Sequence, residues 1–225
     1  MTSNLRLSPD TETSGTPLTA EQTPAIFLID DDEAVLQSLV ALVESRHFIA
    51  HGFTQASEFL SQLDPKTPGC LVMDWRMPEI TGQQLLDELK ERGMPLPVIV
   101  LTAFADVPMA VTAMRRGAVT VLQKPCPDAE LFAAIDQALG ADRLHRGQEL
   151  RKEEIRGRLE RLSPGEREVM QLALAGKMNR EIAAQLNIGL RTVEKRRHNV
   201  MQKMQVESLA ELMQVTMMVG AAAAG

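Results

Sequence analysis

Four short apolar runs of the sequence each end in polar side chains that could do chemistry. In chain order these residues are Asp30 with Asp31, Asp74, Thr102 and Lys124. If the runs are parallel strands, their carboxyl ends meet at one edge of one sheet, where open α/β sheets hold their ligands. Carboxylates, a hydroxyl and an amine gathered at such an edge can hold a divalent cation and a phosphoryl group.

The charges of these groups indicate how such a site would work. Three carboxylates in a partly buried cleft repel one another, so a cation must compensate them or their pKa values must rise. Mg²⁺ fits an all-oxygen site best, because it prefers octahedral oxygen ligands and retains bound waters. Lys124 would neutralise one phosphoryl oxygen and Thr102 would hydrogen-bond another. Transfer of the group to Asp74 then requires mainly positioning and cancellation of charge.

Each of these residues also has a purely structural interpretation. The acidic stretch 30–33 can cap a helix and favour its dipole. Thr102 can begin a loop, and Lys124 with the following proline can form a surface turn. The joint placement of all of them after four successive apolar runs is harder to explain structurally, and it favours the phosphoryl site.

Residues 25–139 alternate between short apolar runs and amphipathic stretches. The runs predict strands at 25–30, 49–53, 70–74, 97–102 and 119–123. The stretches predict helices at 33–46, 56–63, 82–91, 107–116 and 127–139. Asp106 with Pro108 marks one helix start, and Gly93 and Gly117 mark stops. Five repeats of this size predict a doubly wound α/β fold with a five-stranded parallel sheet.

Length and composition set further limits. The chain has 225 residues, of which 44% are hydrophobic, enough for one large or two small domains. It contains no run of about 18 apolar residues, so no membrane span is expected. Residues 1–23, rich in Thr, Ser and Pro, are expected to form a disordered tail and not a signal peptide. Together with two distant cysteines, Cys70 and Cys126, this favours a cytoplasmic protein with free thiols.

Charge is unevenly distributed and suggests two domains with different partners. Residues 24–139 carry 8 Lys and Arg against 16 Asp and Glu, whereas residues 163–225 carry 8 against 6. The segment 140–162 is highly charged and is expected to be a solvated, helical linker. We therefore expect a first domain over 24–139 and a second over 163–219, with a low-complexity tail at 220–225.

The second domain is expected to be small and all-α. Ser163 to Glu166 reads as a capping box with proline at the first helical position. A short helix capped by Asn179, a turn at Gly189 and a basic helix over about 191–204 form a helix-turn-helix pattern. The simpler alternative is a solvated charged helix. A fourth helix is expected from about residue 207 to 219.

Taken together, these residues match the motifs of a known family. The stretch 25–139 resembles the receiver domain of two-component response regulators, and within them the FixJ subgroup. The matching motifs are Asp30-Asp31, Asp74 with Met77-Pro78 and Gly82, Thr102-Ala103, Asp106 to Val111, and Lys124-Pro125. The resemblance implies that Asp74 accepts a phosphoryl group from a phosphohistidine on a sensor histidine kinase.

The resemblance also implies roles for the neighbours of Asp74. Asp31, Asp74 and the backbone carbonyl of Arg76 are expected to bind Mg²⁺, and Asp30 is expected to reach the ion through water. Thr102, Ala103 and Lys124 are expected around the phosphoryl group. The bond between Lys124 and Pro125 is expected to be cis.

One position departs from the family's pattern. Receivers usually carry Tyr or Phe three residues before the lysine, as a rotating switch residue. Val121 occupies that position here, and the chain has no Tyr. Gating by an aromatic side chain at residue 121 is therefore unavailable.

Residues 163–214 resemble the LuxR/NarL DNA-binding domain, through the segments 162–169, 179–183 and 192–204. The resemblance implies that the basic helix lies in the major groove of double-stranded DNA. Base contacts are expected from Glu194, Lys195 and His198, and phosphate contacts from Arg191, Thr192, Arg197 and Lys203. The last helix, with Leu209, Leu212, Met213 and Met217, resembles the family's dimerisation helix. Those side chains could equally close the domain's core.

The combined interpretation is a non-enzymatic, phosphorylation-controlled transcription regulator. Phosphorylation is expected to produce a homodimer through the surface that carries Val111 and Arg115, and RNA polymerase is a further candidate partner. A phosphatase of the haloacid-dehalogenase type is a rival, but its Asp-x-Asp-x-Thr/Val motif would require a residue other than Ala34. A regulator that binds DNA without phosphorylation is a second rival, and only Val121 favours it.

Overall fold

The structure, a computed structural model, describes residues 23–220 and divides into two compact units after Asp142. The predicted tails at 1–23 and 220–225 therefore lie, apart from Thr23 and Gly220, outside the described residues. Within the described part of the chain, no helix is long and apolar enough to cross a membrane.

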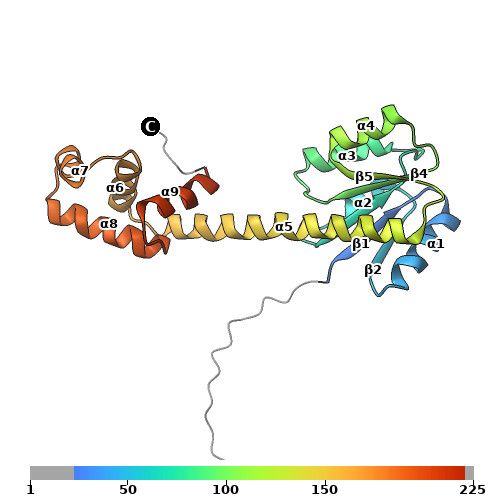
Figure 1. Ribbon diagram of the computed structural model, residues 1–225, viewed down its shortest axis with the longest axis horizontal. Helices are drawn as coiled ribbons and strands as arrows, with labels where there is room; N and C mark the ends of the chain where they lie inside the picture. Colours follow the sequence, from blue (N-terminus) through green and yellow to red (C-terminus); the bar gives the residue numbers. More distant parts are fainter. Residues whose placement is uncertain (1–22, 221–225) are drawn as a thin grey trace, which may run out of the picture. The chain divides into compact units, whose positions relative to one another are not determined.

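The first unit contains one five-stranded sheet with helices on both faces (Figure 1). The strands are β1 (Ala25–Ile29), β2 (Ile49–Phe53), β3 (Gly69–Met73), β4 (Val98–Thr102) and β5 (Ala118–Gln123). The helices are α1 (Glu33–Glu44), α2 (Ala56–Gln62), α3 (Gly82–Glu91), α4 (Val107–Arg116) and the first part of α5 (Asp128–Glu160). All paired strands are parallel, in the order β2-β1-β3-β4-β5. The predicted doubly wound α/β fold is confirmed.

The apolar runs form strands because both faces of the sheet are covered. Every residue of β1, β3 and β4 is buried, as expected for parallel strands between two helical layers. One core cluster joins the sheet to α2, α3 and α4, and includes Phe59, Leu85 and Ala113. The other joins it to α1 and α5, and includes Val43 and Ile135.

The local signals for helix ends agree with the structure. The side chain of Asp106 accepts a hydrogen bond from the Met109 N–H at 2.7 Å and caps α4. Gly117 closes the same helix with φ of 108°, and Gly93 follows α3 with φ of 63°. Both glycines occupy the left-handed region, which other residues adopt at a cost.

The helix at the end of the first unit differs from the prediction. The segment 140–162 was expected to be a helical linker, and it is helical almost to its end. It is not separate from the helix expected over 127–139, however, because α5 continues without interruption to Glu160. The predicted end was wrong because Gly140 weakens a helix without stopping it. In addition, Asp142 still contacts the sheet, where its Oδ2 accepts a hydrogen bond from the Gly69 N–H at 3.1 Å.

The second unit contains the rest of α5 and four shorter helices. These are α6 (Pro164–Leu174), α7 (Asn179–Leu186), α8 (Leu190–Met204) and α9 (Leu209–Met218). Ile155 and Leu162, which were predicted to lie in a solvated linker, are buried in the core of this unit with Met204 and Leu212. The linker prediction therefore missed that its second half belongs to this core.

The capping predictions for the second unit have mixed outcomes. Ser163 and Glu166 form the predicted capping box at α6. Asn179 is not a cap, because it is the first residue of α7 and Met178 holds the cap position. The Glu181 carboxylate instead accepts a hydrogen bond from the Met178 N–H at 2.7 Å.

The last helix both closes the core and leaves apolar groups outside it. Leu212 is buried, whereas Met213 and Met217 are 41% and 65% exposed. Both interpretations of α9, core closure and a dimer surface, are therefore compatible with its placement.

Candidate functional site

Three acidic side chains meet at the carboxyl ends of β1 and β3. Asp30 and Asp31 directly follow β1, and Asp74 directly follows β3, which pairs with β1. Each residue offers a carboxylate oxygen, and these atoms lie within 4.8 Å of one another. The backbone keeps the two strand ends together, because the Asp74 N–H donates to the Ile29 carbonyl at 3.0 Å.

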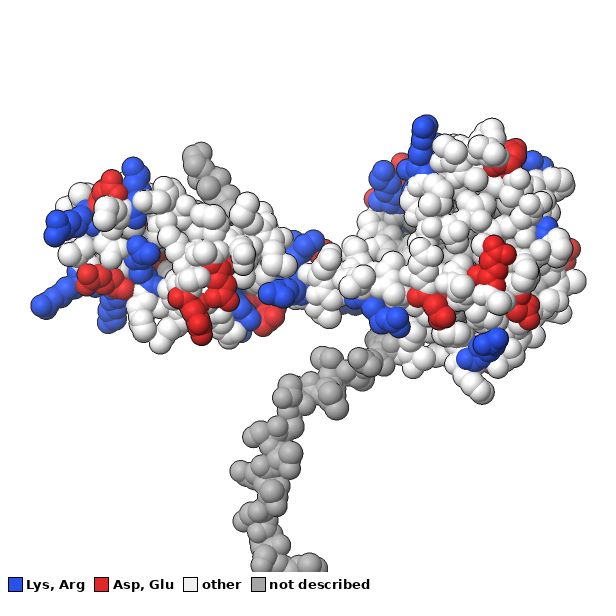
Figure 2. Space-filling model, in the orientation of Figure 1, with Lys and Arg blue, Asp and Glu red and all other residues white. Residues whose placement is uncertain are grey.

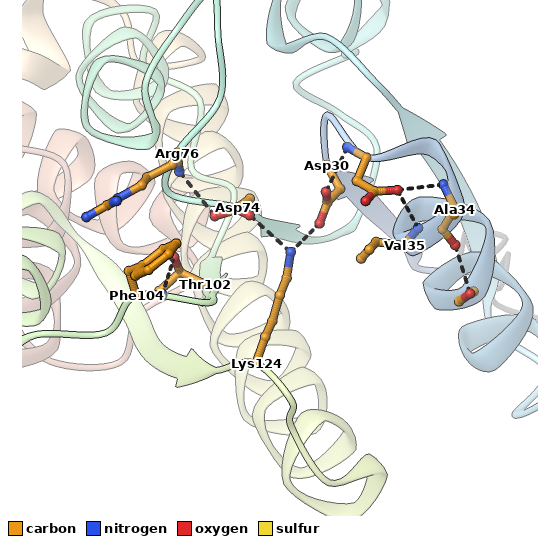
Figure 3. A network of polar contacts seen from close by, with 10 residues as sticks. Asp30, Ala34, Val35, Asp74, Arg76, Thr102, Phe104 and Lys124 are labelled. Carbon is orange, nitrogen blue, oxygen red and sulfur yellow. Dashed lines mark hydrogen bonds and ion pairs between the residues drawn. The ribbon is translucent and has the colours of Figure 1, made fainter.

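Lys124 lies between two of these carboxylates (Figure 3). Its Nζ donates to Asp30 Oδ2 and, at 3.0 Å, to Asp74 Oδ2. Burial lowers the pKa of Lys124, but the hydrogen bonds and charges of the two carboxylates outweigh burial and raise it above its ordinary value. The peptide bond between Lys124 and Pro125 is cis, as expected.

The surroundings of Asp74 leave it partly accessible. Its side chain is 13% exposed, against 3% for Asp30. Its second oxygen, Oδ1, accepts a hydrogen bond from the Arg76 N–H at 3.1 Å. Asp74 is therefore positioned through both oxygens, yet remains open to a small reactant.

The hydroxyl predicted for this site lies at the end of β4. Thr102 is 1% exposed, and its Oγ1 accepts a weak hydrogen bond from the Phe104 N–H at 3.4 Å. Ala103 is exposed at the start of the following loop. Val121 pairs with Val100 in the sheet and is half-buried against the core on the α4 side.

The acidic stretch after β1 divides into capping and site residues. Asp32 caps α1, because its Oδ1 accepts hydrogen bonds from the N–H groups of Ala34 and Val35. Asp31 is exposed and caps nothing. Helix capping therefore explains Asp32 and leaves Asp30 and Asp31 for the carboxylate cluster.

The donor set fits a hard divalent cation. Three carboxylates face one ammonium group, so the cluster keeps an excess of negative charge that a cation would compensate. All the available ligands are oxygens, which Mg²⁺ prefers. Asp31 and Asp74 are the residues that would hold it, and the role expected for the Arg76 carbonyl stays a prediction.

The basic helix predicted in the second unit is α8, and several of its apolar side chains are buried while several of its polar ones are exposed, as expected. Val193, Val200 and Met204 of α8 are buried in the domain cores. On its other sides the exposed side chains include Arg191, Thr192, Glu194, Lys195 and His198. Lys and Arg side chains project from the part of the unit that contains α7 and the start of α8 (Figure 2).

Two cationic side chains of α8 form hydrogen bonds within the second unit. Arg197 Nη1 donates to Asn179 Oδ1 at 2.7 Å and so joins α8 to α7. Lys203 Nζ donates to Glu166 Oε2 at 2.6 Å and to the Arg161 carbonyl at 3.2 Å. Both residues were expected to contact DNA phosphates, and the structure gives each of them a contact within the domain.

Glu166 was predicted from the sequence only as a capping residue, but in the structure its carboxylate is buried. Burial raises its pKa, but hydrogen bonds from Lys203, Ser163 and Asn199 outweigh this effect and lower the pKa to about 2. The sequence gave no signal for this contact. Glu166 lies on α6, whereas Asn199 and Lys203 lie on α8, and α7 separates the two helices in the chain.

Glu166→Gln is expected to destabilise the second unit by roughly 2 kcal/mol at neutral pH, because Lys203 loses its charged partner. The folded-state pKa lies below the ordinary value of 4.5, so the stabilisation is complete above that pH and is lost as the pH falls toward 2. Thermal melting followed by circular dichroism should therefore show a wild-type advantage that shrinks between pH 4.5 and 2. An advantage that stays constant over this interval would contradict the lowered pKa.

The fold and the site together define a class of protein. A doubly wound sheet with an acidic cluster, a hydroxyl and a lysine at one edge is a receiver, and it is joined here to a helix-turn-helix unit. Residues 26–136 match the response regulator receiver domain, and residues 160–216 match the bacterial regulatory proteins of the luxR family. The chain belongs to the family of LuxR-type, FixJ-like two-component response regulators.

Individual relatives cover nearly the whole chain. The transcriptional regulatory protein FixJ of Azorhizobium caulinodans is 43% identical over 88% of this chain and 94% of its own. The response regulator protein TodT of Pseudomonas putida is 38% identical over 88% and 87%. Among solved structures, the response regulator StyR covers 87% of this chain and 98% of its own, with 37% identity and a TM-score of 0.77. Their names describe regulators, and the chain is a two-component response regulator with a DNA-binding domain.

Proposed function

We propose that this response regulator controls transcription through phosphorylation of Asp74 by a sensor histidine kinase. The observation that carries the proposal is the placement of Asp74 between Lys124 and the Arg76 N–H, at the accessible side of the carboxylate cluster. Asp30 is buried and paired with Lys124, so it is a poorer acceptor. The chain itself acts as a phosphoryl acceptor and a DNA-binding protein, and not as a catalyst for other molecules.

The chemistry of the step follows from the positions of the side chains. A carboxylate oxygen of Asp74 attacks phosphorus while the bond from phosphorus to the donor's imidazole nitrogen breaks. Lys124 remains a cation throughout, because its pKa is raised, and it can neutralise a phosphoryl oxygen. The Thr102 hydroxyl donates to another oxygen. Mg²⁺, when bound by Asp31 and Asp74, supplies further charge compensation.

The output is DNA binding by a dimer. We propose that phosphorylation pairs two receivers through α4, where Val111 is 43% exposed and Arg115 is also exposed. Two recognition helices can then engage half-sites one DNA turn apart. Contact with RNA polymerase would follow on the promoter.

The main alternative is a regulator that binds DNA without phosphorylation. Val121 favours it, because the side chain that usually couples the site to the dimer surface is absent. All the charged residues of the site are nevertheless present and close together. We therefore prefer phosphorylation control.

A DNA-binding measurement with a small phosphodonor tests the proposal. Acetyl phosphate with Mg²⁺ should tighten binding to a duplex selected with this chain by about tenfold or more, because a dimer couples two half-sites. Asp31→Ala should remove this gain, and should weaken Mg²⁺ binding as followed by the fluorescence of Trp75, the single tryptophan beside the site.

The controls separate loss of metal from loss of fold. Asp31→Ala relieves repulsion among the carboxylates, so its melting temperature should be unchanged or higher. An unchanged Mg²⁺ affinity in this variant would contradict the metal assignment. A phosphorylated wild type that binds DNA no more tightly would favour the alternative function.

A further inference from the structure

Helix α4 buries few of its side chains in the first unit. Only Ala113 of its ten residues is buried, whereas α3 buries Gly82, Leu85, Leu86 and Leu89. Val107 and Met114 of α4 are 77% and 49% exposed. Elements with few buried apolar contacts open most easily, so polar contacts at the ends of α4 have a large influence on its position.

One such contact lies before the first turn of α4. The guanidinium of Arg76 lies over the ring of Phe104, with 4.4 Å between Cζ and the ring centroid (Figure 3). Each partner is also bonded through its backbone N–H to a residue of the phosphorylation site, Arg76 to Asp74 and Phe104 to Thr102. The contact therefore joins the β3–α3 loop to the β4–α4 loop directly beside the reacting groups.

A second contact lies at the last turn of the same helix. Arg116 Nη1 donates to both carboxylate oxygens of Asp87 on α3. The two side chains are 33% and 42% exposed, so the pair is a moderate restraint and not a buried ion pair. The first contact thus ties the loop before α4 to the β3–α3 loop, and the second ties the last turn of α4 to α3.

We propose that the Arg76–Phe104 and Asp87–Arg116 contacts are positioning contacts that hold α4 in its inactive place, and that they take over the coupling role that Val121 cannot perform. This inference rests on the proposed phosphorylation of Asp74. When the Thr102 side chain rotates toward the phosphoryl group, its Oγ1 moves away from the Phe104 N–H, and the weak hydrogen bond of 3.4 Å between them is lost. Phe104 then leaves Arg76, and α4 retains only the contact with Asp87.

Amide hydrogen exchange of α4 in the full-length chain tests the proposal. Phe104→Leu removes the ring and Asp87→Asn removes the charge. Each should raise exchange of the amides in residues 107–116 by about three- to fivefold, with β4 amides as reference. Asp87→Arg combined with Arg116→Asp should restore the wild-type rates, and so should Phe104→Tyr, which keeps an aromatic ring.

A matched control lies one residue away on α3. Glu88 forms an ion pair with Arg92, the residue that directly follows α3. Glu88→Gln therefore breaks a pair of similar exposure that does not reach α4. The proposal is overturned if Phe104→Leu and Asp87→Asn leave α4 exchange at the level of Glu88→Gln. In a third outcome the variants raise α4 exchange, but acetyl phosphate does not change α4 exchange in the wild type. The two contacts then restrain α4 as proposed, and the proposed control by phosphorylation fails.

Discussion

Asp74→Asn is expected to abolish phosphorylation of this chain. The wild type should gain one phosphoryl group from acetyl phosphate and Mg²⁺, because Asp74 offers a carboxylate oxygen beside Lys124. The amide of asparagine has nearly the same shape but cannot form the acyl phosphate. Intact mass spectrometry counts the added groups directly.

The control for this experiment is an acidic residue of the same unit outside the site. Asp136 is exposed on α5, so Asp136→Asn should leave the labelling unchanged. Undiminished labelling of Asp74→Asn would place the acceptor elsewhere. Asp30 would then be the next candidate, since it shares the same lysine.

Lys195→Ala is expected to weaken binding to the cognate duplex by about 1–3 kcal/mol, which is roughly 5- to 150-fold. Lys195 is exposed on the side of α8 away from the buried Val193 and Val200, where a base edge can be reached. The loss should be much smaller on a scrambled duplex, so the preference at one base pair should relax. Affinity measured on both duplexes gives the ratio that decides the point.

Arg191→Gln is the matched control on the same helix. Arg191 is exposed and was expected to contact phosphate, so its loss should weaken both duplexes alike and lower the salt slope by about 0.9. An equal loss on both duplexes for Lys195→Ala would mean that Lys195 contacts phosphate and that α8 lies differently in the groove. Residues 163–225, which contain α6 to α9, carry only 8 Lys and Arg against 6 Asp and Glu, so base contacts must supply much of the selectivity.

The sequence by itself determined the elements and the chemistry at their ends. Apolar runs of strand length predicted five buried strands, because only a sheet covered on both faces tolerates such runs. The polar residues after these runs were predictable as neighbours, since parallel strands bring their carboxyl ends to one edge. Local caps such as Asp106 and Ser163 were also predictable, because the N–H groups that they bind lie three residues further along the chain.

Only the tertiary structure decided which polar groups pair with one another. The sequence did not indicate that Lys124 would bridge Asp30 and Asp74, or that Lys203 would turn inward to a buried Glu166. It also suggested a solvated linker where Ile155 completes a core. These outcomes depend on side chains that approach from distant elements, and the free energy of each contact is set by the burial and geometry of both partners, which no local pattern contains.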